Sequence, residues 1–284
     1  MLIDPPRVGR AKAAIKAALI ARYRLRNRVS RAPVTGECPV VVSLTSYGER
    51  LDIVAHAIES IAAGSVRPAR LILWVDEPGF TTQDRPMLQR LEQRGLEILP
   101  CDDLGPHKKY FPYSQSAGSS PMPLVTADDD ILYPRRWLAE LWQAHEQTPQ
   151  DFVGHRAVTI ESEGEALAPY ATWRPATSTT ASHRTFVTGG AGVVYPRELL
   201  LALRDRGTAF LEISPRADDV WINAVAVSAG IRARWTGDLS WAWSYPRSQV
   251  NALHHENASQ GGNDVQISRA YGPHLMATVL ADKV

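Results

Sequence analysis

Short apolar runs alternate with amphipathic stretches through the first half of the chain. The runs at residues 40–44, 71–75 and 96–99 are rich in Val, Ile and Leu, which is typical of buried parallel strands. Between them, apolar residues recur every three or four positions, and these segments end at Gly64 and Gly95, as expected of two helices. The pattern therefore predicts a strand–helix–strand–helix–strand opening.

The alternation continues less regularly toward the C-terminus. We expect strands over residues 124–127, 152–158, 192–195 and 231–235, helices over 135–148 and 218–228, and an irregular Thr-, Ser- and Ala-rich loop around Trp173. Such an order builds an α/β fold with a mixed, mainly parallel central sheet flanked by helices on both faces. Because ligands bind beyond the carboxyl ends of the strands in such sheets, the loops at 45–50, 76–80 and 101–110 should share one crevice.

The composition indicates a cellular compartment and shows that charge is unevenly distributed along the chain. The 284 residues are 44% hydrophobic, which is ordinary for a globular protein. Cys38 and Cys101 are too few for a disulfide framework and lack the spacing of a zinc site, which favours a reducing compartment such as the cytoplasm. Residues 1–31 hold nine Lys or Arg and one acid, a charge of +8, so the remainder carries −7.

The basic segment has two interpretations. It could make peripheral contact with an anionic membrane through residues 1–31, or it could be a solvated, partly disordered tail. Ile15, Leu19, Ile20 and Leu25 do not gather on one helical face, which weakens an amphipathic anchor. No apolar run is long enough to span a bilayer, and the N-terminus lacks the apolar stretch of a signal peptide. We expect no nucleic-acid partner, because the body of the chain is acidic and shows no helix-turn-helix pattern.

Three adjacent carboxylates, Asp128, Asp129 and Asp130, follow the apolar run at 124–127. Their mutual repulsion is costly at the end of a buried strand unless a cation or hydrogen bonds relieve it. On an extended segment Asp128 and Asp130 point to one side and Asp129 to the other, so two can face a ligand while the third braces the loop. Mg²⁺ or Mn²⁺ is commonly held by one or two carboxylates and by substrate phosphate oxygens. The triplet predicts a site for a metal and a diphosphate; the alternative is an acidic turn that caps the next helix.

The segment at 126–134, TADDDILYP, resembles the D-x-D region of glycosyltransferases with the GT-A fold. Four other segments follow the order of landmarks in those enzymes: Thr45-Ser46-Tyr47 with Arg50, GPHKKY at 105–110, TGGAGVVY at 188–195, and Asp218-Asp219-Val220-Trp221. They are most similar to exostosin-like N-acetylhexosaminyltransferases and the bacterial heparosan-capsule N-acetylglucosaminyltransferase. The resemblance covers residues 39–235, and it departs from those relatives at the Asp-Asp pair, where they often have Glu-Asp.

The resemblance implies a donor site. Asp130 would bind Mn²⁺ or Mg²⁺ with Asp128 as a second ligand, while Asp128 and Asp129 would contact the ribose, the sugar or metal-bound water. The residues implied to line the nucleoside pocket are Thr45, Tyr47, Arg50 and Asp76. Lys108 or Lys109 would neutralise the diphosphate, with a solvated loop as the alternative.

The resemblance also implies the reacting carboxylate. Asp219 would lie nearest the anomeric carbon, acting as a base in an inverting enzyme or stabilising or attacking the oxocarbenium ion in a retaining one, which the resemblance favours. Asp218 would cap the helix it opens. The acceptor or sugar contacts that we expect are Gly189, Gly190, Trp173 and Trp221, the two tryptophans because aromatic faces suit sugars, although most tryptophans pack in cores. His254 could complete the metal shell.

The predicted organisation is a basic arm and linker (1–38), a GT-A domain (39–250) and a C-terminal tail (251–284) that closes over or flanks the site. The domain divides into a nucleotide half (39–133) and an acceptor half (134–250). The predicted activity is transfer of a sugar from a nucleotide-diphosphate donor, UDP-linked, to a hydroxyl of a glycan or glycolipid. The alternatives are a sugar-phosphate nucleotidyltransferase, which normally has a Gly-rich phosphate loop after its first strand, and a non-catalytic carbohydrate- or nucleotide-binding protein of the same fold.

Overall fold

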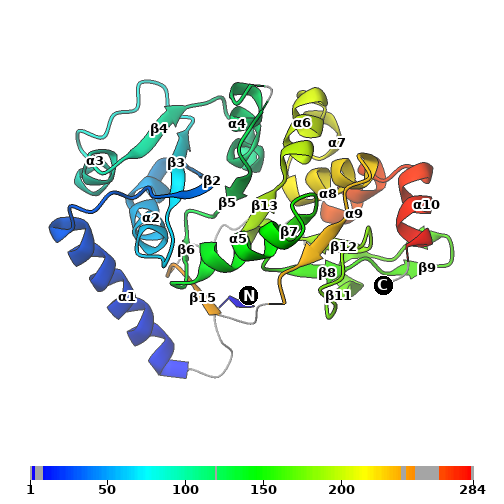
Figure 1. Ribbon diagram of the computed structural model, residues 1–284, viewed down its shortest axis with the longest axis horizontal. Coiled ribbons are helices and arrows are strands. Elements are labelled where there is room, and N and C mark those ends of the chain that lie inside the picture. Colours follow the sequence, from blue (N-terminus) through cyan, green and yellow to red (C-terminus); the bar gives the residue numbers. More distant parts are fainter. Residues whose placement is uncertain (1, 4–8, 119, 238–240, 247–261, 283–284) are drawn as a thin grey trace.

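A seven-stranded sheet forms the centre of the computed structural model, which describes residues 2–3, 9–118, 120–237, 241–246 and 262–282 (Figure 1). The strand order is β14-β7-β13-β5-β2-β3-β4. Their bounds are β2 Cys38–Ser46, β3 Pro68–Val75, β4 Leu96–Pro100, β5 Leu124–Thr126, β7 Phe152–Gly154, β13 Val193–Tyr195 and β14 Ala233–Trp235. The pairings among β5, β2, β3 and β4 are parallel, whereas β13 runs antiparallel to both β5 and β7. The mixed, mainly parallel sheet that the sequence predicted is confirmed.

Helices cover both faces of this sheet, so β2 is buried on each side. Val40, Val42 and Leu44 pack into one core cluster with α2 and α5, while Val41 packs into the other with α4, α6 and α8. Burial on both faces explains why β2 is a continuous apolar run rather than an alternating one. These helices and α3 have the bounds α2 Val54–Ala62, α3 Pro86–Glu92, α4 Phe111–Ser116, α5 Trp137–Gln147, α6 Arg197–Asp205 and α8 Asp218–Ser228, and the short α7 is Phe210–Ile213.

Antiparallel strands lie at the end of the molecule opposite α1 (Figure 1). The predicted strand at 152–158 is two strands in different sheets, β7 and β8, because the chain turns at His155, whose Nε2 lies 2.9 Å from the carbonyl oxygen of Trp137. The segment expected to be an irregular loop contains paired strands. The strands of this region are β8 Ala157–Thr159, β9 Ser162–Glu163, β10 Ala166–Leu167, β11 Arg174–Pro175 and β12 Thr185–Val187, ordered β11-β8-β12 and β10-β9. Their runs are too short to show periodicity.

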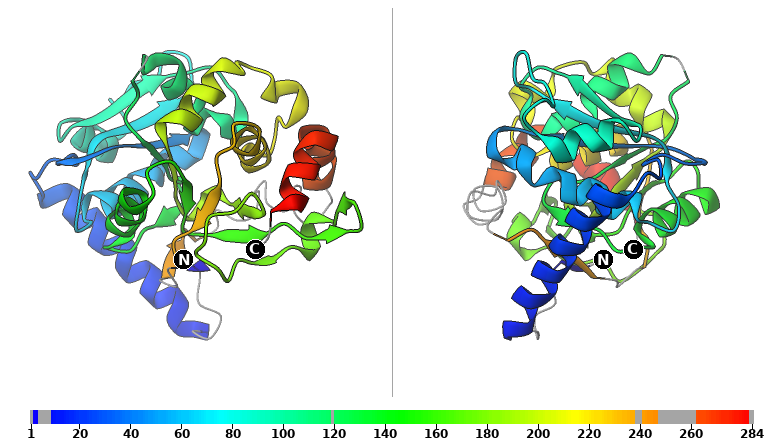
Figure 2. Two further views of the ribbon diagram at one scale, coloured as in Figure 1. Left: turned by 45° about the vertical axis from the view of Figure 1, so that its right-hand side comes forward. Right: turned by 90° about the vertical axis from the view of Figure 1, so that its left-hand side faces the viewer.

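Two helices of the C-terminal segment, α9 (Gly262–Ala270) and α10 (Pro273–Ala281), pack beside α8 (Figures 1 and 2). A third core cluster joins them, with Val220 of α8 against Ile267, Tyr271 and Val279. The predicted tail is thus partly helical, and its described part flanks the acceptor half. The remaining short strands, β1 (Leu2–Ile3), β6 (Ile131–Leu132) and β15 (Trp241–Ser244), form a sheet in the order β1-β15-β6.

The basic N-terminal segment contains a helix, α1 (Gly9–Val29), that lies along α2 and α3 at the edge of the nucleotide half (Figure 1). The interpretation as a partly disordered tail is wrong for these residues. Tyr23 and Asn27 of α1 are buried, and Lys16 Nζ donates a hydrogen bond of 2.9 Å to Ser244 Oγ. Among the described residues, no helix has the length and apolar character needed to cross a membrane.

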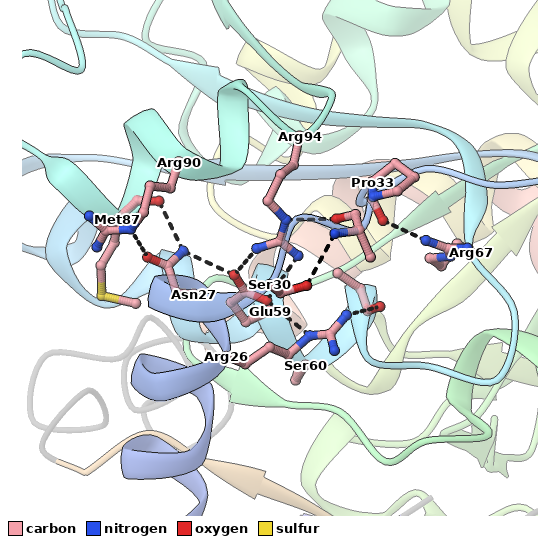
Figure 3. Close-up of polar contacts among 12 residues, drawn as sticks. Arg26, Asn27, Ser30, Pro33, Glu59, Ser60, Arg67, Met87, Arg90 and Arg94 are labelled. Carbon is pink, nitrogen blue, oxygen red and sulfur yellow. Dashed lines mark hydrogen bonds and ion pairs between the residues drawn. The ribbon is translucent and has the colours of Figure 1, made fainter.

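A buried ion network fastens α1 to the body (Figure 3). The carboxylate of Glu59 on α2 has no exposed area, and it accepts hydrogen bonds from Arg94 Nη1 at 2.5 Å and from Asn27 Nδ2 at 2.9 Å. Arg26 Nε lies 3.2 Å from the same carboxylate, and Arg90 Nε donates to Asn27 Oδ1 at 2.8 Å. Removing one partner from such a buried pair typically costs about 3–5 kcal/mol, because a charge is left uncompensated. The network therefore makes α1 part of the folded body.

Candidate active site

The loops that follow β2, β3 and β4 converge at the edge of the sheet where the aspartates lie. Ser46 at the end of β2 donates a hydrogen bond of 2.7 Å to Asp129 Oδ2. Asp76, directly after β3, pairs with Lys108 from the short 3-10 turn at Gly105–Lys109. The ring of Tyr47 lies 5.4 Å from Lys108 Nζ. The structure thus brings the residues of the predicted crevice together.

Arg50 compensates the negative charge of two of the three aspartates. It stands in the 3-10 turn at Gly48–Asp52, and its Nε donates a hydrogen bond of 2.9 Å to Asp129 Oδ2. Its Nη2 donates to Asp129 Oδ1 and lies 3.3 Å from Asp130 Oδ2. One guanidinium thus contacts both carboxylates. The prediction that the side chains of Asp129 and Asp130 point to opposite sides is therefore wrong. The reason is local: β5 ends at Thr126, and Asp129 and Asp130 lie in a turn rather than on an extended segment.

Asp128 faces a different cation. Its Oδ1 pairs with Lys109 Nζ, and its backbone N–H donates a hydrogen bond of 2.7 Å to the hydroxyl of Tyr133. Lys109 is itself held in place by Ser43 of β2, whose Oγ donates to the Lys109 carbonyl oxygen at 2.6 Å. The two neighbouring lysines therefore serve different carboxylates, Lys108 at Asp76 and Lys109 at Asp128. Neither is the solvated loop residue of the alternative interpretation.

The predicted nucleoside side of the site combines an aromatic face with charge. Tyr47 is 54% exposed, with the Arg50 guanidinium 6.0 Å from its ring centre. Thr45 is partly exposed, and its Oγ1 donates a hydrogen bond of 3.1 Å to the carbonyl oxygen of Trp74. Burial lowers the pKa of Lys108, but the hydrogen bonds that its Nζ donates to Asp76 and Asp103 outweigh burial and raise the pKa above its usual value. An exposed ring beside permanent cations can stack on a base and contact a phosphate.

Two glycines connect Asp128 with the start of α8. Gly189 and Gly190 form a tight turn after β12, where the Gly189 N–H donates a hydrogen bond of 2.8 Å to Asp219 Oδ1. A Cβ atom on Gly189 would lie 3.0 Å from Asp219 Oδ1, and one on Gly190 would lie 3.1 Å from Asp128 Oδ2. Both distances are tighter than ordinary contacts, so the small residues let the backbone approach both carboxylates. Asp128 and Asp219 therefore border the same turn, although they are far apart in sequence.

The acidic pair of α8 is electrostatically coupled to Lys109. Burial and then the charge of Asp218 raise the pKa of Asp219, while Lys109 and the Gly189 N–H lower it, and the net pKa is about 8. The pKa of Asp218 is also raised, mainly by burial. Asp218 is the first residue of α8, after Ala217 at the N-cap position, and its capping role stays a prediction. Conversely, burial lowers the pKa of Lys109, but three carboxylates outweigh burial and raise it well above its usual value.

The described residues alone do not supply a complete set of ligands for a metal ion. Within the part of the chain that is described, no three His, Cys, Asp or Glu side chains form a ready metal site. Asp130 and Asp128 are carboxylates at the site edge, and Mg²⁺ or Mn²⁺ typically takes one or two carboxylates plus phosphate oxygens of a substrate. Two such carboxylates would need the oxygens of a diphosphate to complete the ligand set. His254, the third predicted ligand, lies outside the described residues.

The two predicted aromatic sugar contacts lie in the core. Trp173 is 6% exposed, packs against Phe186 and donates its ring N–H to the carbonyl oxygen of Ala168. Trp221 is 3% exposed and packs edge-on to Phe210. Their burial does not support the predicted contacts with a sugar. Most tryptophans pack in cores in this way.

Three residues that sequence reasoning missed hold the site together. Ser46 binds Asp129, Tyr133 binds the backbone of Asp128, and Asn223 joins α8 to β12 through two hydrogen bonds with the backbone of Val187, of 2.8 and 3.0 Å. Ser46 and Tyr133 lie inside the motifs that identified the site. Asn223 could have been found as a polar residue within the apolar helix at 218–228.

Comparison with solved structures places the architecture among the GT-A glycosyltransferases, so the predicted fold is confirmed. One similar structure is the mannosyltransferase PcManGT from Pyrobaculum calidifontis in complex with GDP-Man and Mn²⁺. It has 14% sequence identity and a TM-score of 0.50, with 95% of this chain and 84% of that chain covered. A second is TarS from S. aureus in complex with UDP-GlcNAc, with 12% identity, a TM-score of 0.52, and 85% and 70% covered.

A third similar structure is GalNAc-T7 with UDP, GalNAc and Mn²⁺, with 12% identity and a TM-score of 0.52. The alignment covers 95% of this chain but only 60% of that one, so the chain spans less than two thirds of this relative. No curated protein sequence matches the chain.

At the level of sequence families, residues 106–236 match the Fringe-like family model. The match covers less than half of the chain, and it includes both lysines, the three aspartates, the glycine turn and the Asp218-Asp219 pair. Tyr47, Arg50 and Asp76 lie before it. The Fringe-like match and the GT-A neighbours support a glycosyltransferase, and the narrower resemblance to exostosin-like enzymes stays a prediction.

Proposed function

We propose that the protein is a metal-dependent glycosyltransferase that moves a sugar from a nucleotide-diphosphate donor, a UDP-sugar, to a hydroxyl of a glycan or glycolipid. One observation carries the proposal. Asp128 and Asp219 border the same Gly189-Gly190 turn, with Lys109 paired to Asp128 and electrostatically coupled to Asp219, at the edge of a GT-A sheet. A single compact site thus holds a carboxylate cluster for the donor and a separate carboxylate for the chemistry.

In this proposal the donor lies across the ends of β2, β3 and β5. Tyr47 offers an exposed face to the base, and Arg50 and Lys109 offer cations to the diphosphate. Asp130 and Asp128 would hold Mn²⁺ or Mg²⁺ together with phosphate oxygens of the donor, and the ion would supply charge stabilisation for the departing diphosphate. The named ligands of the similar structures, GDP-Man, UDP and UDP-GlcNAc, are nucleotides of this diphosphate class.

Asp219 is the proposed reacting carboxylate. The Gly189 N–H donates a hydrogen bond of 2.8 Å to one of its oxygens, which orients the side chain. Its pKa of about 8 makes it a stronger base than an exposed aspartate, and a base is most effective when its pKa is near the working pH. In an inverting reaction Asp219 takes the proton of the acceptor hydroxyl. In a retaining reaction its carboxylate faces the positive charge that develops at the anomeric carbon.

The test is release of nucleoside diphosphate by the purified protein, with Mn²⁺ and a panel of nucleotide sugars, with and without candidate acceptors. We expect turnover with a UDP-sugar whose sugar is a hexose or an N-acetylhexosamine. Formation of pyrophosphate and a nucleotide sugar from a sugar phosphate and a nucleoside triphosphate would instead indicate a nucleotidyltransferase.

Two variants separate the proposed roles. Asp130→Ala should abolish metal-dependent donor binding, measured by titration calorimetry. Asp219→Asn should bind the donor within about threefold of the parent and lose at least about a hundredfold in turnover, as expected for removal of a general base. Asp84→Ala, at an exposed position outside the residues assigned to the site, is the control and should change neither. Unchanged donor affinity in Asp130→Ala would contradict the metal assignment.

A further inference from the structure

Helix α1 presents an apolar stripe to solvent on the side that does not face the body. Ile15, Leu25 and Val29 are 37%, 61% and 65% exposed, and they are half of the large hydrophobic residues that are exposed in the described chain. At 100° per residue these three positions fall within about 80° of one another around the helix. Ala11 and Ala18, both exposed, lie in the same sector. The stripe therefore runs the length of the helix.

The structure shows which apolar residues of α1 face the body and which face solvent, which the sequence pattern did not show. Tyr23 faces the body, and Leu19 and Ile20 are half-buried, so these apolar residues blur the periodicity although they do not belong to the outer face. The opposite side of α1 is held by Asn27, which donates a hydrogen bond to Glu59, and Arg26 pairs with the same carboxylate from beside the stripe (Figure 3). The outer stripe is thus presented by a rigid, anchored helix rather than by a loose tail.

The charge around the stripe has one sign. Residues 9–29 include seven Lys or Arg and no Asp or Glu. Arg22 lies within the stripe and Arg28 beside it, and both are exposed. On another side, α1 lines a cavity of about 570 Å³ with Lys12, Lys16 and Arg24, and no carboxylate is among the described lining residues. Positive charge therefore surrounds the helix.

We propose that the outer face of α1 docks the protein on an anionic lipid bilayer, with Ile15, Leu25 and Val29 in the interface and Arg22 and Arg28 at the head groups. Apolar burial and attraction to anionic lipids act together in such helices. A second copy of the chain is a poor occupant, because two such faces would bring like charges together. This docking is a property separate from sugar transfer. Because α1 is fastened to the nucleotide half, docking would hold that half next to a membrane surface.

The test is co-sedimentation of the full chain with vesicles of phosphatidylcholine alone and of equimolar phosphatidylcholine and phosphatidylglycerol. We expect at least about tenfold stronger partition onto the anionic vesicles, lost at about 1 M salt, where screening is nearly complete. Equal partition onto both kinds of vesicle, or no effect of salt, would overturn the proposal without any variant being needed.

Matched variants assign the effect to this face. Arg22→Glu with Arg28→Glu should weaken partition onto anionic vesicles at least about tenfold, and Leu25→Gln with Val29→Gln several-fold. The controls are Arg206→Glu, and Leu211→Gln with Val265→Gln, at exposed positions on other elements. Thermal melts confirm that each variant is folded. Membrane docking would be refuted by equal partition of the α1 variants and the controls. It would also be refuted if sedimentation velocity showed a dimer that Leu25→Gln disrupts.

Discussion

At the scale of single residues, Asp219, the proposed reacting carboxylate, also affects the stability of the fold. Burial raises its pKa to about 8, and an unfolded aspartate loses its proton near pH 4. Between these values the folded state keeps a proton that the unfolded state has released. The contribution of Asp219 to stability is therefore full below about pH 4 and is lost as pH rises through about 8.

Asp219→Asn removes this titration. We expect the variant to gain stability relative to the parent as pH rises, by about 1 kcal/mol or more at pH 8 compared with pH 5. Thermal melts of both proteins at the two pH values measure the difference. The control is Asp205→Asn, whose carboxylate is largely exposed and should show no such trend. A loss of stability in Asp219→Asn that is equal at both pH values would contradict the buried, protonated state.

Gly189 is the residue on which the geometry of Asp219 depends most directly. A methyl group there would lie 3.0 Å from Asp219 Oδ1, so Gly189→Ala should push the carboxylate from its position. We expect turnover to fall at least about tenfold while donor affinity changes little, because misplacement of a reacting group by a fraction of an ångström is costly. Gly272→Ala, where a Cβ atom would meet nothing within 4 Å, is the matched control. Similar turnover in both variants would show that the turn does not position Asp219.

At the scale of elements, α1 is the part of the fold where sequence and structure differ most. The sequence predicts a basic arm and linker over residues 1–38, whereas Asn27 and Arg26 of α1 complete the shell of a buried carboxylate on α2. A separate arm could be removed without loss of stability. Removal of this helix would take hydrogen-bonding partners from Glu59 and expose the buried Glu59–Arg94 pair to solvent.

Deletion of residues 1–31 therefore tests the integration of α1. We expect the shortened chain to melt at least about 5 °C lower than the parent, or to be insoluble, for a loss of about 3 kcal/mol. Glu59→Gln in the full chain should destabilise in the same direction, because Arg94 would keep a buried charge without its counter-ion. A shortened chain with an unchanged melting temperature would restore the interpretation as a separable arm.

At the scale of the whole molecule, the GT-A architecture explains why distant segments form one site. Parallel strands end at one edge, so Tyr47, Asp76 and Asp128 meet there because of the order of their strands. The antiparallel strand β13 and the short β12 turn the chain back, which brings the Gly189-Gly190 turn and the start of α8 to the same edge. The Fringe-like match spans these returning segments and the aspartates, and it leaves the nucleoside side outside.

Much of the fold was determined by the sequence alone, because long apolar runs and clear helical periodicity leave few alternatives for β2, β3, α2 and α8. The position of the triple aspartate at a strand end was likewise readable, since strand order dictates it. Short elements such as β8, β11 and β12 were not, because two or three residues carry no period.

Only the tertiary structure decided how the charges pair. It assigned Lys108 to Asp76 and Lys109 to Asp128, gave Arg50 to both Asp129 and Asp130, and buried Trp173 and Trp221 in the core. It also showed which residues of α1 face solvent. The physical reason is the same throughout: pairing and burial depend on contacts between residues far apart in the chain, and local pattern does not encode those contacts.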